Sequence, residues 1–215
     1  MHFIHSCGKL VVPTSDEDEI ALGVLFERAA ANGVPVERVG PQEVRELEPL
    51  AASSRGGLWS PSTAAADPSA VSRSILQDAV LGGASLFPSC AVSALRPAEG
   101  GGALLTSADG AQLQARHVVN AAGLHADTLA HQLGFGLQYS ILPFKGLYMY
   151  CRGLPLRRLL YPVPDAKQPF LGVHFTVTVD GQVKIGPTAM PAFWREQYSG
   201  LSNFSLKEAV EIAAT

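Results

Sequence analysis

The run HVVNAAGLHAD, from His117 to Asp127, decides the fold prediction. Its apolar start predicts a strand over 117–120, and its small residues and glycine predict a tight turn over 121–123 before a helix from Ala126. Small residues at such a turn let the backbone approach a ligand closely, and the start of a following helix favours an anion such as a diphosphate. An ordinary strand–turn–helix junction is the alternative, and the spacing alone does not decide between the two.

Upstream of this run, the chain predicts helices first and short strands afterwards. Helices are expected to begin after the capping residue Ser15, at Pro41, and at Asp67-Pro68. Short apolar stretches broken by Gly, Pro and Asp-Gly then predict strands. These stretches span residues 85–87, 91–95, 103–106 and 112–115.

Downstream of the run, the apolar stretches are longer. Strands are predicted over 141–150, 170–179 and 182–186, and Ser205 with Glu208 predicts a capped final helix. Early helices followed by antiparallel hairpins indicate an α+β fold rather than a regular βαβ array.

The composition excludes several classes of protein. A chain of 215 residues with a net charge of −3 has no basic surface for nucleic acid. Its three cysteines are scattered without a CxxC pair, so we expect a reducing intracellular compartment, no disulfide framework and no metal site. No apolar run approaches the roughly 18 residues of a membrane span, so no transmembrane segment is predicted.

Five motifs carry a family resemblance. They are CGKL at 7–10, PFKG at 143–146, YPVPD at 161–165, PFLGVHFT at 169–176 and GPTA at 186–189. In this order and at these spacings, the chain resembles the L-2-hydroxyglutarate dehydrogenase/oxidase family of FAD-dependent oxidoreductases, within the D-amino acid oxidase-like superfamily. The resemblance covers essentially the whole chain.

The resemblance implies a substrate domain with an antiparallel or mixed sheet and flanking helices, plus part of a Rossmann-like FAD-binding domain. Residues 1–80 would lead from the substrate domain into the FAD domain, 81–135 would form the partial FAD domain, and 136–215 the substrate-binding sheet with a truncated helix. The GxGxxG fingerprint that follows a first Rossmann strand is absent from the sequence. We therefore expect an internal fragment of a longer product, inactive by itself.

FAD is the cofactor that the resemblance implies. The turn of the opening run looks like the superfamily's second flavin-contacting strand, and Cys90-Ala91-Val92 resembles the strand whose backbone contacts the adenine. The expected cofactor-binding residues are Val92, Asn120, Ala121, Ala122, Gly123 and Gly146.

Oxidation of a 2-hydroxy acid requires a base at the hydroxyl and donors for the carboxylate. His174 is the candidate base or hydroxyl orienter, because an imidazole exchanges protons near neutral pH and this one lies in an apolar strand; a hydrogen-bonded core histidine is the alternative. Lys145 is the second catalytic candidate, as a carboxylate contact, although relatives often carry Arg there and a solvated turn lysine remains open. Tyr161 and Thr176 are the expected substrate-binding residues, with a half-buried sheet aromatic as the alternative for Tyr161.

The resemblance thus implies oxidation of an L-2-hydroxy acid, L-2-hydroxyglutarate first, to the 2-oxo acid. The electron acceptor stays open among oxygen, a quinone and an electron-transfer protein, and the compartment among cytoplasm, mitochondrion and the periphery of a membrane. An amine or amino acid oxidase of the same superfamily is a second hypothesis. A non-catalytic remnant that binds no FAD is a third.

Overall fold

The computed structural model describes residues 3–165, 167, 170 and 172–213, and the chain divides into two compact units. Unit 1 consists of Met1–Gly82 and Gly146–Ala189, and unit 2 of Gly83–Lys145 and Met190–Thr215. Helices and mixed sheets occur together in this arrangement, which confirms the predicted α+β class. The functional domains predicted for residues 1–80, 81–135 and 136–215 stay a prediction.

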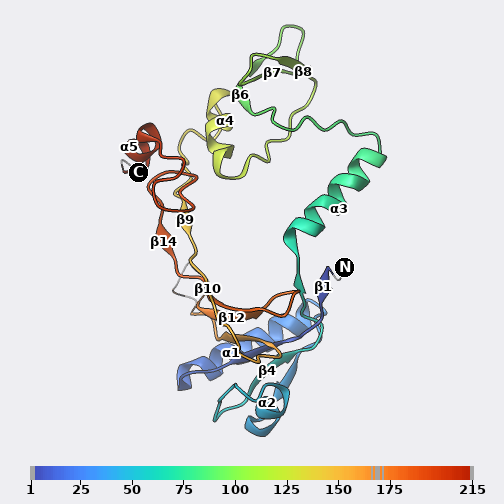
Figure 1. The fold of residues 1–215 in the computed structure, drawn as a ribbon, viewed down its shortest axis with the longest axis vertical. Helices are drawn as coiled ribbons and strands as arrows, with labels where there is room; N and C mark the ends of the chain where they lie inside the picture. The colour runs from blue at the N-terminus through green and yellow to red at the C-terminus, as the bar shows by residue number, and fades with distance from the viewer. Residues whose placement is uncertain (1–2, 166, 168–169, 171, 214–215) are drawn as a thin grey trace. The chain divides into compact units, whose positions relative to one another are not determined.

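A mixed sheet of seven strands forms the centre of unit 1 (Figure 1). Its strands, in spatial order, are β10 (Met149–Tyr150), β13 (Val183–Gly186), β12 (His174–Val177), β11 (Leu159–Pro162), β2 (Lys9–Val12), β4 (Gly57–Ser60) and β3 (Glu37–Val39). Neighbouring strands are antiparallel except β2 and β11, which run parallel. A separate ribbon joins β1 (Ile4–His5) to β5 (Ala65–Ala66).

Helices α1 (Asp16–Ala31) and α2 (Pro41–Leu47) cover opposite faces of this sheet, with β4 between them (Figure 1). Leu22 of α1 packs with Leu58, while Val44 of α2 packs with Leu10. The predicted cap of α1 is confirmed, since the Ser15 hydroxyl accepts a bond from the Asp18 N–H at 3.3 Å. The two hydrophobic faces of the sheet are therefore each buried against a helix.

Helix α3 (Pro68–Leu81) begins where the sequence predicts. The Asp67 carboxylate accepts hydrogen bonds from the N–H groups of Ser69 and Ala70, at 2.9 and 3.1 Å. Ala70 is its buried residue, so α3 is held mainly at its first turn. Asp67 thus acts as a helix cap, as the sequence indicates.

Unit 2 contains a three-stranded antiparallel sheet and a second ribbon. The sheet is β6 (Val92–Pro97), β7 (Ala103–Ser107) and β8 (Gln112–Ala115), and the ribbon is β9 (Phe144–Lys145) with β14 (Met190–Pro191). The helical segments are the 3-10 turn η1 (Gly123–His125), α4 (Ala126–Gln132) and α5 (Leu206–Ala213). Gln132 ties α4 to β6, because its side-chain oxygen accepts a bond from the Leu95 N–H at 2.6 Å.

The strand predicted over 117–120 is wrong. Among the described residues no strand pairs with this stretch, and Val119 is 90% exposed. A strand is maintained by the hydrogen bonds of a neighbour, so an apolar run without one stays irregular. The turn and the helix that follow are confirmed as η1 and α4.

Three other strand predictions are wrong or too long. No strand forms over 85–87, the stretch 141–150 is reduced to β9 and β10, and 170–179 to β12, with residues 171 and 168–169 outside the described part. At Gly146 the backbone packs so closely against Pro187 that an added Cβ would lie 2.7 Å from the Pro187 Cβ. This close approach interrupts the long strand predicted from apolar content alone.

Candidate active site

The strands β11 and β12 place Tyr161 and His174 opposite each other. Leu160 pairs with Phe175, so the next opposed position joins the two rings. Their centroids lie 4.0 Å apart, and their planes meet at 15°. His174 is 5% exposed, so its imidazole is held flat against the phenol ring.

One hydrogen bond decides the tautomer of His174. Its Nδ1 lies 2.9 Å from the carbonyl oxygen of Gly172, and because a carbonyl can only accept, Nδ1 carries the hydrogen. In the neutral ring the lone pair is therefore on Nε2. Within the described residues Nε2 has no hydrogen bond. This is the arrangement of a base.

Tyr161 is the neighbouring hydrogen-bonding group. Burial raises the pKa of its phenol above the ordinary value, and a hydrogen bond with the Thr176 hydroxyl opposes that rise only in part. The phenol therefore stays protonated at neutral pH and can donate to a bound oxygen. Unit 1 thus brings together three of the residues predicted from the sequence: His174, Tyr161 and Thr176.

Lys9 joins this group and was not predicted as a site residue. The parallel pairing of β2 with β11 aligns Lys9 with Leu159 and Val11 with Tyr161. The Lys9 Nζ lies 5.5 Å from the centroid of the Tyr161 ring. The available signal was a lysine inside the apolar CGKL strand, where a charged side chain needs a partner or a purpose.

Lys145 does not belong to the same unit as His174, Tyr161 and Thr176. Lys145 lies in β9 of unit 2, opposite Met190, whereas His174 and Tyr161 belong to unit 1. Gly146 begins the second segment of unit 1, where its contact with Pro187 leaves no room for a side chain. The roles predicted for Lys145 and Gly146 stay predictions.

The predicted flavin turn lies in unit 2. The Asn120 side chain stabilises the turn with two hydrogen bonds. Its oxygen accepts a bond from the Ala122 N–H at 3.2 Å, and its amide donates to the Ala126 carbonyl at 2.7 Å. Ala121 and Gly123 are exposed, and Gly123 has a φ of +54°. No side chain over 121–123 is larger than a methyl group, so the backbone is open to a flat ring such as a flavin.

Val92 occupies a second place in unit 2. It lies in β6 opposite Ser107 and lines an apolar hollow of about 180 Å³ with Phe87, Leu105 and Leu113. The hollow is apolar but smaller than the roughly 300 Å³ at which ligand pockets usually begin. Its role as an adenine contact stays a prediction.

A buried ion pair behind the turn was not predicted. The Arg195 guanidinium donates to both carboxylate oxygens of Asp127, each at 2.9 Å, and also to the Leu124 carbonyl. Burial tends to raise the pKa of Asp127, but the Arg195 bonds and the Ile141 N–H outweigh it and hold the pKa below its ordinary value. The two residues lie 68 positions apart, so no local pattern announces the pair.

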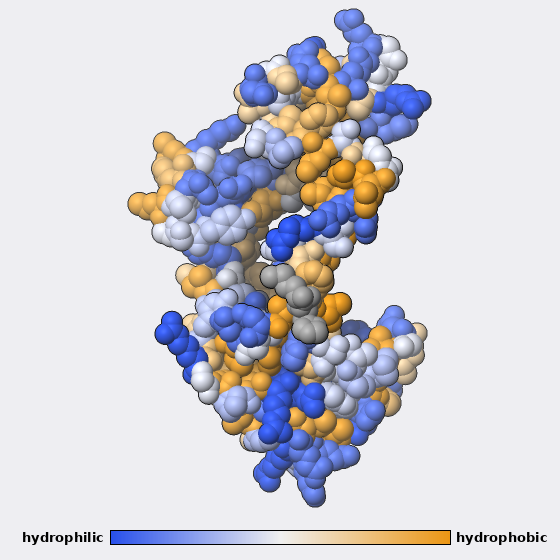
Figure 2. All heavy atoms as spheres, turned by 45° about the vertical axis from the view of Figure 1, so that its right-hand side comes forward, coloured by the Kyte–Doolittle hydropathy of each residue, from blue (hydrophilic) through white to orange (hydrophobic). Residues whose placement is uncertain are grey.

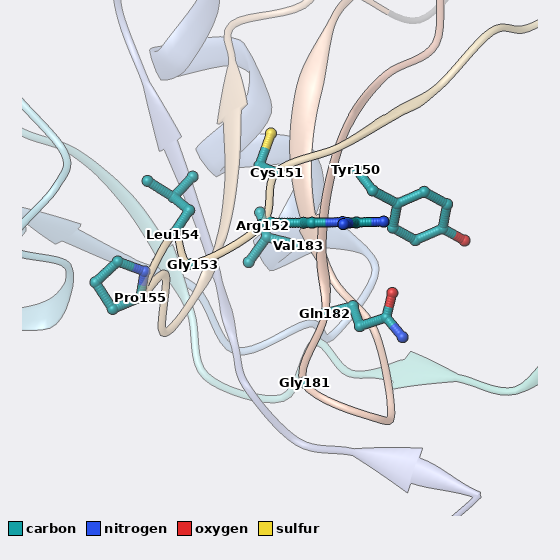
Figure 3. A pocket seen from close by; sticks show the side chains of 9 residues that line it. All are labelled: Tyr150, Cys151, Arg152, Gly153, Leu154, Pro155, Gly181, Gln182 and Val183. Atoms are coloured by element: carbon teal, nitrogen blue, oxygen red, sulfur yellow. The ribbon is translucent and has the colours of Figure 1, made fainter.

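A large hollow of unit 1 lies away from these residues. It measures about 680 Å³ and lies between the 151–155 loop and the tip of the β12–β13 hairpin, and Figure 3 shows Arg152 edge-on beside the Tyr150 ring. None of the residues that line it is a predicted site residue.

A family model described as FAD dependent oxidoreductase matches residues 1–211. The chain belongs to this family. The prediction of a flavoprotein fold is thereby confirmed. The matched residues include both the Asn120–Gly123 turn and the group formed by His174, Tyr161 and Thr176.

Curated relatives agree with the predicted resemblance. The chain is 34% identical to an L-2-hydroxyglutarate dehydrogenase of Escherichia coli (strain K12), over 96% of this chain and 49% of that protein. It is 32% identical to the mitochondrial L-2-hydroxyglutarate dehydrogenase of Homo sapiens, over 96% of this chain and 47% of that protein. The chain thus spans about half the length of the curated relatives it matches.

Solved structures support the fold. An L-alpha-glycerophosphate oxidase from Mycoplasma pneumoniae with FAD bound matches with a TM-score of 0.78 at 20% identity, over 98% of this chain and 56% of that one. An L-proline dehydrogenase from P. horikoshii matches with a TM-score of 0.76 at 20% identity, over 98% and 56%. At 20% identity, the likeness to these two structures shows the fold of the chain and nothing more.

Two features are missing from the part of the chain that the structure describes. No group of three or more His, Cys, Asp or Glu side chains there is arranged to hold a metal ion. No helix in that part combines the length and the apolar content required to cross a membrane.

Proposed function

We propose that this protein oxidises an L-2-hydroxy acid, L-2-hydroxyglutarate in the first place, to the corresponding 2-oxo acid. The observation that carries the proposal is the geometry of His174, whose Nε2 has no hydrogen-bond partner among the described residues and whose ring is locked by its Gly172 hydrogen bond and by stacking on Tyr161. The names of the curated relatives support the choice of substrate.

FAD supplies the hydride acceptor of such a reaction when it is bound. The residues that we propose to hold it are Asn120, Ala121, Ala122 and Gly123, with Val92 and Gly146 as further contacts. The small side chains and open backbone of the turn support this assignment, because a bulky residue there would obstruct a flat ring.

The proton of the substrate hydroxyl goes to Nε2 of His174 in this proposal. Such a base contributes about 10²- to 10⁴-fold to the rate. Tyr161, kept protonated by burial, and Thr176 orient the substrate by hydrogen bonding. Lys145 is proposed as a carboxylate contact on the strength of its charge and its place in the PFKG motif.

The first test is the visible absorption spectrum of the purified chain after incubation with FAD and desalting. Retained flavin that bleaches on addition of L-2-hydroxyglutarate is the expected result. Glycine and other amino acids are added in parallel, because bleaching by these alone would favour the amino acid oxidase hypothesis. A chain that retains no flavin at any FAD concentration would support the non-catalytic hypothesis.

The electron acceptor is measured in the same cuvette. Oxygen, a quinone and an electron-transfer flavoprotein are added separately to the bleached sample. The acceptor that restores the flavin band fastest is the one to pursue.

A further inference from the structure

A hollow of about 360 Å³ lies beside the His174 group in unit 1, and Lys9 belongs to both. On one side α1 contributes Arg28 and Leu25, and on the other the sheet contributes Lys9, Val11 and Ser60. Its size falls in the range of small-molecule sites. We call it the Lys9 hollow.

The charges around the Lys9 hollow have one sign. Lys9 and Arg28 both line it, and none of the residues that line it is acidic. Within the part of the chain that the structure describes, neither cation takes part in an ion pair. The rest of the lining combines apolar side chains with the polar Asn32, Ser60 and Thr63. Two cations over such a surface favour an anionic group with an apolar stem.

The strand register connects this hollow to the proposed base. Lys9 lies above one part of the Tyr161 ring, and His174 stacks on the same ring. The Lys9 Nζ lies 5.5 Å and the imidazole centroid 4.0 Å from the centroid of that ring, so both groups contact one tyrosine. In a five-carbon 2-hydroxy diacid the C2 hydroxyl and the C5 carboxylate lie roughly 4–5 Å apart, and a hydrogen bond of about 3 Å at each end lets one molecule reach both groups.

Packing alone explains part of this arrangement. A lysine can lay its stem on apolar surface and extend its ammonium group, and a cation in the last turn of a helix is stabilised by the helix dipole. Neither effect accounts for two cations that converge on one hollow without an acid.

We propose that Lys9 is the specificity-determining residue for the second carboxylate of the substrate, which enters the Lys9 hollow while the hydroxyl lies at His174. This inference rests on the proposed function and sharpens it, because it predicts a preference for 2-hydroxy diacids over 2-hydroxy monoacids of equal chain length. Arg28 adds a weaker, more exposed contact.

The test compares two ligands that differ only at the far end, L-2-hydroxyglutarate and L-2-hydroxypentanoate. Binding to the full chain is followed by NMR titration without added FAD. For the wild type we expect the diacid to bind at least about 10-fold more tightly, as one charge-assisted pair allows. Lys9→Met, which keeps the stem, should abolish this preference and leave the monoacid affinity within about 2-fold, whereas Lys9→Arg should retain it.

The matched control is Arg38→Met. Arg38 also lies over an aromatic ring in unit 1, 5.2 Å from the Phe26 centroid, but it does not line the Lys9 hollow. It should leave the preference unchanged. Equal binding of both acids by the wild type, no binding of either, or a preference that survives in a folded Lys9→Met chain each overturns the proposal.

The two proposals fail separately. Flavin that bleaches equally with both acids would leave the proposed oxidation standing and remove the role of Lys9. A Lys9-dependent preference for the diacid in a chain that never reduces flavin would keep the binding role and remove the proposed activity.

Discussion

Unit 1 and unit 2 are stabilised in different ways. Unit 1 buries three hydrophobic clusters against its sheet, with Leu10 and Val44 fully buried. Unit 2 has a buried ion pair near its turn and leaves large apolar side chains exposed, such as Val119 at 90% and Leu137 at 66%. Figure 2 shows hydrophobic and hydrophilic surface interspersed on the visible face of the chain.

The difference concerns how each proposed site is supported. The His174 group stands on a sheet whose strands are packed on both faces, so its geometry rests on many small contributions. The Asn120–Gly123 turn is followed by a seven-residue helix whose first turn depends on one arginine. We therefore expect substitutions in the His174 group of unit 1 to alter chemistry before structure, and substitution of Arg195 in unit 2 to alter structure first.

The largest expected effect is on rate. His174→Gln keeps a polar side chain but removes the base, and should lower the rate of flavin reduction by about 10²- to 10⁴-fold. Rapid-mixing absorbance measures the rate, and flavin retention after desalting is the control, which should not change. A His174→Gln chain that reduces flavin at the wild-type rate would exclude this residue as the base.

The second effect is on the stability of unit 2. Arg195→Ala leaves the Asp127 carboxylate buried without its partner, which should cost about 3–5 kcal/mol. Hydrogen exchange resolved by peptide should show faster exchange in α4, while amides of β2 and β11 keep their protection, because the partners of Arg195 all lie in unit 2. Glu196→Ala, next to Arg195 but exposed, is the matched control.

The third effect is on the stability of unit 1. Leu10→Ala creates a cavity in the sheet of unit 1 and should cost about 2–5 kcal/mol, measured as faster exchange in β2 and β4. Ile20→Ala removes a side chain that is 77% exposed and should change little. If Leu10→Ala loosened unit 2 to the same extent, the two units would unfold as one and the comparison would be wrong.

The smallest effects come from pH, and they have opposite signs. Asp127 has a folded-state pKa below its ordinary 3.8, so its stabilising contribution is present above that value and is lost as the pH falls through the lowered pKa. Tyr161 has a folded-state pKa above 10.0, so its contribution is present below that value and is lost as the pH rises through the raised pKa.

Urea unfolding of matched variants separates these two contributions. The stability difference between wild type and Asp127→Asn should shrink in acid, and that between wild type and Tyr161→Phe should shrink in alkali. A Tyr161→Phe difference that grows above the ordinary tyrosine pKa would contradict the burial argument.

Much of the local structure could be predicted because its causes lie close together in the chain. Ser15 and Asp18 cap the same helix from three residues apart, and Asp180-Gly181 forms the turn between the strands β12 and β13, with Gly181 at a φ of +79°. The motif order also predicted an FAD-dependent oxidoreductase, and the match over residues 1–211 confirms this broader family. Strand prediction failed over 117–120, because apolar content alone cannot show whether a hydrogen-bonding neighbour exists.

The sequence by itself determined the fold class, the family, the helix caps and the candidate residues His174, Tyr161 and Thr176. Only the tertiary structure decided that these residues meet, and that Lys9 joins them from the other end of the chain. Register explains the first point, since shifting β11 by one residue would turn Tyr161 to the opposite face of the sheet. Parallel pairing of β2 with β11 explains the second, because such long-range contacts depend on the packing of the whole sheet and leave no periodic signal in either strand.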